Sequence, residues 1–95
     1  MENKNNHLLV FSAAWCGPCR MMKALVWSDS SVQQALSSFK SHKFIDIDDV
    51  QGQALAKIYH VRSVPTIVVT DKEGQPLKVA NTMDAKETVR FLENA

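Results

Sequence analysis

Two cysteines separated by two residues are the feature that most constrains how this chain can fold. Residues 15–19 read Trp-Cys-Gly-Pro-Cys, so Cys16 and Cys19 bracket a glycine and a proline. The continuous apolar run of residues 8–11 before them predicts a strand buried on both faces. From Cys19 onward, apolar residues recur at helical spacing, which predicts a helix. The two cysteines are therefore expected where a buried strand ends and a helix begins.

A cysteine pair at the N-terminus of a helix suits reversible disulfide chemistry. The unpaired N–H groups and the positive end of the helix dipole stabilise a thiolate at Cys16. A thiolate is the attacking species in disulfide exchange, and Cys19, one helical turn further in, can attack a mixed disulfide. Proline has no N–H to leave unpaired in the first turn, and glycine keeps the approach to Cys16 open. The expected catalytic residues are Cys16 and Cys19, with Gly17 and Pro18 in support.

The rest of the chain predicts further helices and strands in alternation. Apolar spacing predicts helices over residues 19–26 and 32–39, a third helix capped by Asp48 or Asp49, and a fourth opened by a capping box at Asp84 and Glu87. Alternating or β-branched patterns predict strands over residues 44–48, 64–70 and 77–79, with a hairpin turn at 71–74. This order predicts one α/β domain over residues 1–95, in which residues 1–6 form a flexible polar arm.

The same spacing predicts which side chains of the helices are buried. In the first helix the expected buried residues are Met21, Met22, Leu25 and Val26. In the third helix they are Ala54, Leu55 and Ile58, and in the last helix Ala85, Val89 and Leu92. Trp27 is also expected to be a packing residue because its neighbours are apolar.

Composition and charge exclude several classes of protein. Ninety-five residues make one small domain, and 45% hydrophobic with 22% charged residues exclude disordered and collagen-like chains. A net charge of +1 offers no electrostatic footprint for nucleic acid or an anionic membrane. No apolar stretch approaches the roughly 18 residues of a membrane span, so no membrane insertion is expected. No signal peptide is recognised, which predicts a cytoplasmic location, or a periplasmic one if a leader is missing from this chain.

Two motifs together resemble those of one protein family. The Trp-Cys-Gly-Pro-Cys sequence resembles the active-site motif of thioredoxins, and Val-Pro-Thr at residues 64–66 resembles their cis-proline loop. The likeness runs from about residue 8 to the C-terminus, with the motifs in the family's order. It implies a thioredoxin fold, in which helices flank a central mixed β-sheet. It also implies that Cys16 attacks a substrate disulfide and that Cys19 resolves the mixed disulfide.

The resemblance further implies how substrates and electrons reach the cysteines. Pro65 would be cis and face the cysteine pair, the backbone of Val64 would pair with an extended substrate segment, and Trp15 would shield the active-site surface. The implied partners are disulfide-containing protein substrates and an electron donor, either a thioredoxin reductase or a membrane thiol donor. No nucleotide or flavin motif is present, so the Cys16–Cys19 disulfide is the expected redox centre without a further cofactor or metal. A monomer is the default for this fold.

The chain departs from the thioredoxin pattern in several places. It is too short before the cysteines for the N-terminal strand and helix of larger thioredoxins. Val10 stands where the family usually has a buried aspartate, and Phe44 where a lysine often accompanies it. The aspartate is thought to help proton transfer at the resolving cysteine, so slower resolution by Cys19 is expected. Ala24 and Ala80 replace a common proline and a common glycine, respectively.

A second likeness concerns the branch of the superfamily. Residues 23–36 and 48–65 resemble the thioredoxin-like domains of transmembrane thiol:disulfide interchange proteins and their relatives. Those relatives act in the bacterial envelope, mostly in reductive roles. The glycine–proline pair between the cysteines also resembles that of reducing members, so a protein-disulfide reductase is the leading hypothesis.

Other functions remain open on the sequence alone. A thioredoxin-fold binding module could use the surface around Trp15 and Val64. An oxidase or isomerase of the same fold could instead move electrons in the opposite direction. The two cysteines could be inert core thiols or half of a zinc site. A zinc site needs four ligands, however, and the remaining candidates are scattered: His7, His42 and His60. Arg20 could either lower the pKa of Cys16 or be a solvated surface residue.

Overall fold

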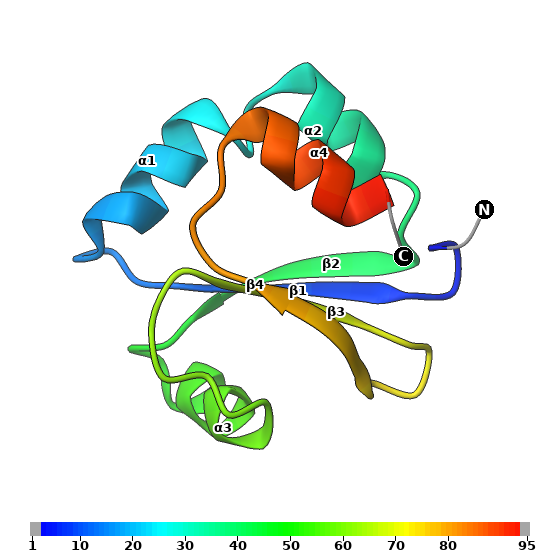
Figure 1. The fold of residues 1–95 in the computed structure, drawn as a ribbon. Helices are drawn as coiled ribbons and strands as arrows, with labels where there is room; N and C mark the ends of the chain where they lie inside the picture. The colour runs from blue at the N-terminus through cyan, green and yellow to red at the C-terminus, as the bar shows by residue number, and fades with distance from the viewer. Residues whose placement is uncertain (1–2, 94–95) are drawn as a thin grey trace.

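A mixed four-stranded β-sheet forms the centre of the structure, a computed structural model that describes residues 3–93 (Figure 1). Its strands are β1 (His7–Ser12), β2 (Ser41–Asp46), β3 (Thr66–Thr70) and β4 (Pro76–Ala80). Their order across the sheet is β2-β1-β3-β4. Strand β2 runs parallel to β1, whereas β3 runs antiparallel to both β1 and β4. The predicted α/β class with a mixed central sheet is therefore confirmed.

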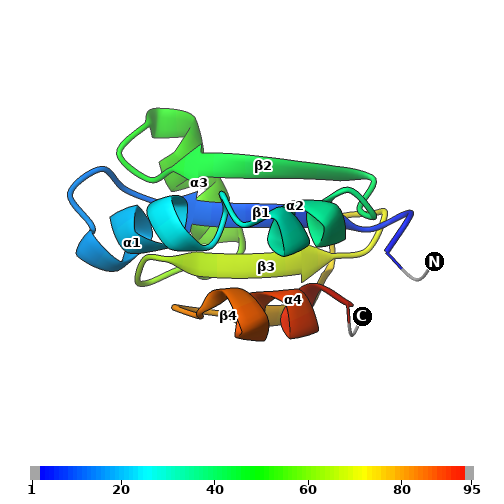
Figure 2. The same ribbon diagram turned by 90° about the horizontal axis from the view of Figure 1, so that it is seen from above.

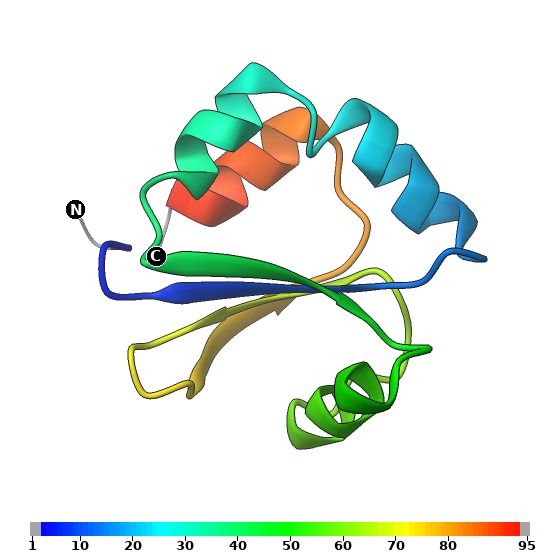
Figure 3. The same cartoon turned by 180° about the vertical axis from the view of Figure 1, so that it is seen from behind.

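Helices cover both faces of this sheet. On one face lie α1 (Gly17–Leu25), α2 (Ser30–Leu36) and α4 (Ala85–Glu93), which Figure 2 shows from above. On the opposite face lies α3 (Val50–Ile58), which is seen below the sheet in Figures 1 and 3. The cysteine-containing loop leaves the sheet at the carboxyl end of β1 and leads directly into α1. Within residues 3–93, no helix has the length and hydropathy needed to cross a lipid bilayer.

Strand β1, which leads to the cysteines, has buried side chains on both faces of the sheet. Leu8 and Val10 lie in the hydrophobic cluster beneath α1, α2 and α4. Phe11 lies in a second cluster, together with Ile45 and Val68, on the side of α3. The continuous apolar sequence thus supplies both faces of a central strand, as predicted.

A short break separates α1 from α2. The Ser28 hydroxyl donates a hydrogen bond to the Ala24 carbonyl at 2.6 Å, near the end of α1. The Asp29 carboxylate then caps α2 by accepting the N–H groups of Ser31 and Val32, at 2.9 and 3.2 Å. The predicted second helical segment therefore exists, and its start is fixed by an aspartate N-cap.

The prediction for the buried face of α1 was half right. Met22 and Val26 are buried in the core, but Met21 and Leu25 are largely exposed. The four residues form two neighbouring i, i+4 pairs, and a short helix lying on a sheet buries a narrow stripe. The pair that points toward β1 is buried, and the adjacent pair faces solvent.

The prediction for the buried face of α3 was wrong for two residues. Ala54 and Ile58 are exposed, whereas Gly52 is buried. A Cβ atom on Gly52 would lie 1.8 Å from the backbone oxygen of Asp46, so the helix axis approaches β2 at this glycine. The face of α3 turned toward the sheet therefore starts at Gly52. It continues, at the helical spacing i+3, i+4 and i+7, with Leu55, Ala56 and Tyr59.

Residues 3–6 do not form a free polar arm. Residues 1–2 of the expected flexible segment lie outside the described residues. Asn3 and Asn6 are buried, and the Asn6 amide donates to the Asn3 side-chain oxygen at 3.1 Å. The Asn3 amide in turn donates to the carbonyl of Leu92 in α4. The capping box that opens α4 is confirmed, because Asp84 and Glu87 each accept the other's backbone N–H.

The close approach at Gly52 gives a test of the fold. The Gly52→Ala substitution should lower the free energy of unfolding by about 2–3 kcal/mol, because backbone must move to admit the methyl group. This loss exceeds the gain of about 1 kcal/mol that alanine brings to a helix. Urea denaturation of the oxidised protein measures the difference, with Gln53→Ala, an exposed change in the same helix, as the control. Unchanged or increased stability of Gly52→Ala would contradict the packing described.

Candidate active site

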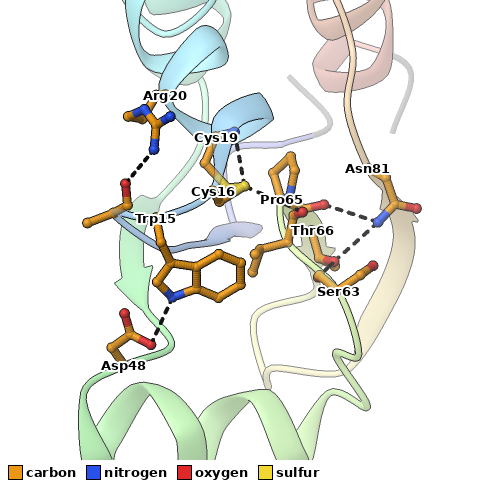
Figure 4. Close-up of a disulfide and its surroundings, with 11 residues drawn as sticks. Trp15, Cys16, Cys19, Arg20, Asp48, Ser63, Pro65, Thr66 and Asn81 are labelled. Carbon is orange, nitrogen blue, oxygen red and sulfur yellow. Dashed lines mark hydrogen bonds between the residues drawn. A yellow bond between two sulfur atoms is a disulfide. The ribbon is translucent and has the colours of Figure 1, made fainter.

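The two cysteines lie where the end of β1 leads into α1, and they form a disulfide (Figure 4). Their Cα atoms are 5.2 Å apart. Cys16 is the N-cap residue of α1, and its sulfur accepts the backbone N–H of Cys19 at 3.1 Å. Gly17 begins the helix, and Pro18 occupies its first turn, where no N–H is needed. When the disulfide is reduced, the same N–H and the helix dipole favour negative charge on the Cys16 sulfur.

The disulfide is nearly enclosed by apolar residues. Cys16 is 4% exposed and Cys19 is 7% exposed, so exposure alone does not distinguish them. They form a small cluster with Ala13, against which Ile47 and Val64 pack. The two cysteines differ in position. Cys16 is the N-cap residue just before α1, and Cys19 lies within the first turn of α1. Reaction with another protein therefore requires that protein to dock closely against the rim of this cluster.

A cis peptide bond links Val64 to Pro65, as the resemblance implied. Pro65 lies beside the cysteine pair (Figure 4), and the Val64 carbonyl oxygen is 3.6 Å from the Cys16 sulfur. A disulfide sulfur carries no proton, so this is a van der Waals contact in the oxidised state. The backbone at Val64 thus borders the Cys16 sulfur.

Polar residues fix the loop that contains Pro65. The Asn81 amide donates hydrogen bonds to the Pro65 carbonyl at 3.1 Å and to the Thr66 hydroxyl oxygen at 3.2 Å. The Thr66 hydroxyl donates to the Ser63 carbonyl at 2.6 Å. Asn81 was missed from the sequence, although a signal existed. Since Ile67 pairs with Ala80 in the β3–β4 hairpin, counting one residue outward places Asn81 opposite Thr66.

Trp15 lies on the surface beside the cysteines and is 62% exposed. Its indole N–H donates to the Asp48 carboxylate at 3.2 Å, as Figure 4 shows. The Asp46 carboxylate accepts the Asp48 backbone N–H at 2.9 Å and so orients the segment that carries Asp48. Sequence reasoning had assigned Asp48 or Asp49 to the cap of the third helix. Asp49 occupies the N-cap of α3 without a side-chain hydrogen bond, whereas Asp48 anchors Trp15.

Arg20 also lies beside the pair, on the exposed side of α1. Its guanidinium donates to the Ala14 carbonyl at 2.9 Å, in the loop that precedes the cysteines (Figure 4). This bond ties the first turn of α1 to the end of β1. The arginine thus has a definite structural contact in addition to its charge.

Two of the positions that depart from the thioredoxin pattern, Val10 and Phe44, line the same groove as Cys19. Val10 is 1% exposed and pairs in register with Phe44 of β2. Phe44 is 52% exposed, and its ring packs edge-on against Trp27 at a centroid distance of 5.5 Å. Trp27 itself packs against the core, as expected. An apolar pair thus occupies the positions where the family's acid and lysine would lie.

The histidines do not gather around the cysteines. His7 shares a hydrogen bond with the Ser41 hydroxyl at 2.6 Å, His42 contacts the Phe44 ring, and His60 follows α3 with a positive φ. In the part of the chain that the structure describes, no three or more His, Cys, Asp or Glu side chains are grouped to hold a metal ion. The position of the Cys16–Cys19 disulfide at the start of α1 supports thiol–disulfide exchange.

Comparisons with known proteins agree with this geometry. A family model described as Thioredoxin matches residues 1–94. Over 91 residues the chain is 26% identical to a thioredoxin of Mycoplasma genitalium, covering 96% of this chain and 83% of that protein. Over 94 residues it is 32% identical to thioredoxin 1 of Synechococcus elongatus, covering 88% and 82%.

A solved structure with the same fold comes from a different kind of protein. The reduced C-terminal domain of DsbD from Neisseria meningitidis superimposes with a TM-score of 0.79 at 24% identity. The superposition covers 96% of this chain and 81% of that domain. At this identity the likeness concerns the fold, and it confirms the α/β architecture predicted from the two motifs.

Proposed function

Since this chain belongs to the thioredoxin family and holds a CxxC disulfide, which together support thiol–disulfide exchange, we propose that it works as a protein-disulfide reductase. The observation that carries the proposal is the position of the Cys16 sulfur. It caps α1, accepts the Cys19 N–H at 3.1 Å, and lies 3.6 Å from the Val64 carbonyl at the rim of the site.

The reaction proceeds in two exchanges. In the reduced protein, the Cys16 thiolate attacks one sulfur of a substrate disulfide, forms a mixed disulfide and releases the other substrate sulfur as a thiolate. The Cys19 thiolate then attacks the Cys16 sulfur, forms the Cys16–Cys19 disulfide and releases the second substrate thiolate. Two electrons pass to the substrate, whose thiolates take up protons from water. The 5.2 Å separation of the two Cα atoms lies in the range that a disulfide needs.

Substrate binding is assigned to the rim of the cluster. An extended substrate segment would pair with the backbone at Val64, and Trp15 would cover its apolar side chains. Hydrogen bonds from Asn81 to the Pro65 carbonyl and to Thr66 hold this loop in place before a substrate arrives. A loop that is already held in place lowers the entropy lost on binding, which favours association with the substrate segment.

Proton transfer at Cys19 must take a different route from the one that the family pattern implies. Val10 offers no acceptor, but a groove of about 1210 Å³ beside α1 and β2 is lined by Cys19, Ser12 and Asp46 among other residues. Water in this groove would reach the resolving sulfur from behind. Proton transfer to water is less efficient than transfer to a positioned base, so resolution is the expected slow step.

The reductive direction requires a source of electrons. The glycine–proline pair resembles that of reducing members, and the fold resembles a domain of DsbD. A cytoplasmic protein would receive electrons from a thioredoxin reductase, and a periplasmic one from a membrane thiol donor. The Cys16–Cys19 pair is the whole redox centre in this proposal, with no added cofactor.

Replacing each cysteine separately tests the two roles. Cys19→Ser should accumulate a mixed disulfide between Cys16 and a disulfide-containing protein such as insulin, because the second exchange is blocked. Cys16→Ser should form no such adduct, and both variants should lose multiple turnover. Non-reducing electrophoresis with mass spectrometry identifies the adduct. A Cys16→Ser/Cys19→Ser double variant that still binds the biological partner and keeps its function without reducing disulfides would instead support a binding module.

Restoring a buried acid tests the slow step. Val10→Asp should raise the rate of Cys19 resolution by at least about tenfold, since a positioned carboxylate accepts the thiol proton. Stopped-flow decay of the mixed disulfide measures this rate, and Val10→Asn, with similar shape and no charge, should not accelerate it. Circular dichroism identifies variants that fail to fold, because a buried carboxylate is destabilising. An equal or slower rate in folded Val10→Asp would show that proton transfer does not limit resolution.

A further inference from the structure

The two edges of the sheet are protected to different degrees. Among the described strands, β4 forms one edge and begins with Pro76, which has no N–H to offer a neighbouring strand. Its pairing with β3 is also shifted between Val69 and Thr70. The other edge is β2, which contains neither proline nor glycine and pairs with β1 in unbroken register over six residues. Figure 2 shows β2 along the outer margin of the sheet. The Asp46 carbonyl at its end accepts the Asp49 N–H at 3.2 Å and lies against Gly52 of α3, so the part of this edge that can accept another strand is His42 to Phe44.

The backbone of β2 presents regularly spaced groups at this edge. Ile47 donates its N–H to the Ser12 carbonyl of β1 at 3.0 Å. Backbone groups alternate in direction along a strand, so Ile45 and Lys43 also face β1. The N–H and C=O groups of Phe44 and His42 therefore point away from the sheet.

The side chains of this edge include an unusual aromatic. Phe44 is 52% exposed although it lies on the same face as the core helices, where it touches Trp27. His42 packs edge-on against it at a centroid distance of 6.1 Å. The groove beside α1 runs along this edge, with Trp27, His42 and Phe44 in its wall. A large exposed aromatic on an open edge strand is a feature of strands that pair with another chain.

Charge along the edge selects the partner. Lys40 and Lys43 lie toward the start of β2, and Asp46 and Asp48 lie at its end. Antiparallel pairing of two identical strands brings the basic end of each against the acidic end of the other. A parallel arrangement would instead align like charges, which is unfavourable.

We propose that this chain forms a symmetric dimer in which two β2 strands pair antiparallel, with Phe44 opposite Phe44 of the second copy. In this register His42 lies opposite Asp46 of the second copy, and Lys43 lies opposite Ile45. Side chains that lie opposite each other are then on the same face of the sheet. The outward N–H and C=O groups of the two Phe44 residues form a hydrogen-bonded pair. The two sheets then meet edge to edge at the two Phe44 residues. The dimer replaces the monomer expected from the fold alone.

The dimer should be weak and concentration-dependent, because the interface consists of one short strand per copy and a pair of aromatic rings. Sedimentation equilibrium of the oxidised protein should show the mass rising from 10.6 kDa toward twice that value as the concentration increases from about 10 µM to about 1 mM. A mass that stays at the monomer value up to about 1 mM would overturn the proposal.

Exchanging His42 and Asp46, which lie opposite each other across the proposed interface, tests the register of the β2–β2 pairing. His42→Asp places two carboxylates together and should raise the dissociation constant at least about tenfold. Adding Asp46→His to it restores a histidine–aspartate pair across the interface, with the two residues exchanged, and should recover dimerisation. Val79→Asp introduces the same charge on the exposed part of β4, so it should leave dimerisation unchanged. Failure of the double variant to recover, or loss of the dimer in Val79→Asp, would contradict pairing through β2.

Cross-linking separates this dimer from other contacts. In the Cys16→Ser/Cys19→Ser background, Phe44→Cys should form an interchain disulfide under mild oxidation by diamide, because the two positions face each other across the symmetry axis. His42→Cys should not, since its two copies are offset by four residues, or about 13 Å along the strand. Equal cross-linking of both variants would indicate random collision and contradict the proposed register.

Discussion

Burial of β1 between two layers of helices is the constraint on which the rest of the structure depends. Leu8 and Val10 fill the space beneath α1, α2 and α4, and Phe11 fills the space on the side of α3. Full burial of each such side chain contributes about 1.5–3 kcal/mol, so this strand holds the two layers together. Because β1 also pairs with β2 and β3, its position determines the positions of both neighbours.

The active site follows from the same strand. Its carboxyl end delivers Cys16 to the start of α1, and its antiparallel register with β3 sets Phe11 opposite Thr66. Pro65, one residue before Thr66, therefore lies beside the cysteines although it is distant in sequence. Asn81 and Asp48 then hold the proline loop and Trp15 from two further segments. A nearly enclosed disulfide with a rigid rim is the result.

The local sequence determined most of what was predicted correctly. The strand before the cysteines, the capping box at Asp84 and the cis bond at Pro65 each depend on neighbouring residues or on a short motif. The buried face of α3 could not be predicted in this way, because a contact between Gly52 and the backbone of Asp46 sets its orientation. The role of Asn81 likewise depends on the register of a hairpin, which apolar spacing alone does not specify.

Position 10 holds a valine where the family usually has a buried aspartate. The reduction potential of the Cys16–Cys19 pair is therefore the central question, because it depends on how the two thiolates are stabilised. The reductase function requires that the reduced protein be a strong donor of electrons. The reduction potential of Cys16–Cys19, measured by equilibration with defined thiol buffers and trapping of free thiols, tests this most directly. A value near the roughly −270 mV typical of thioredoxin is predicted. A value of about −120 to −180 mV, typical of oxidases and isomerases, would contradict a reductive role.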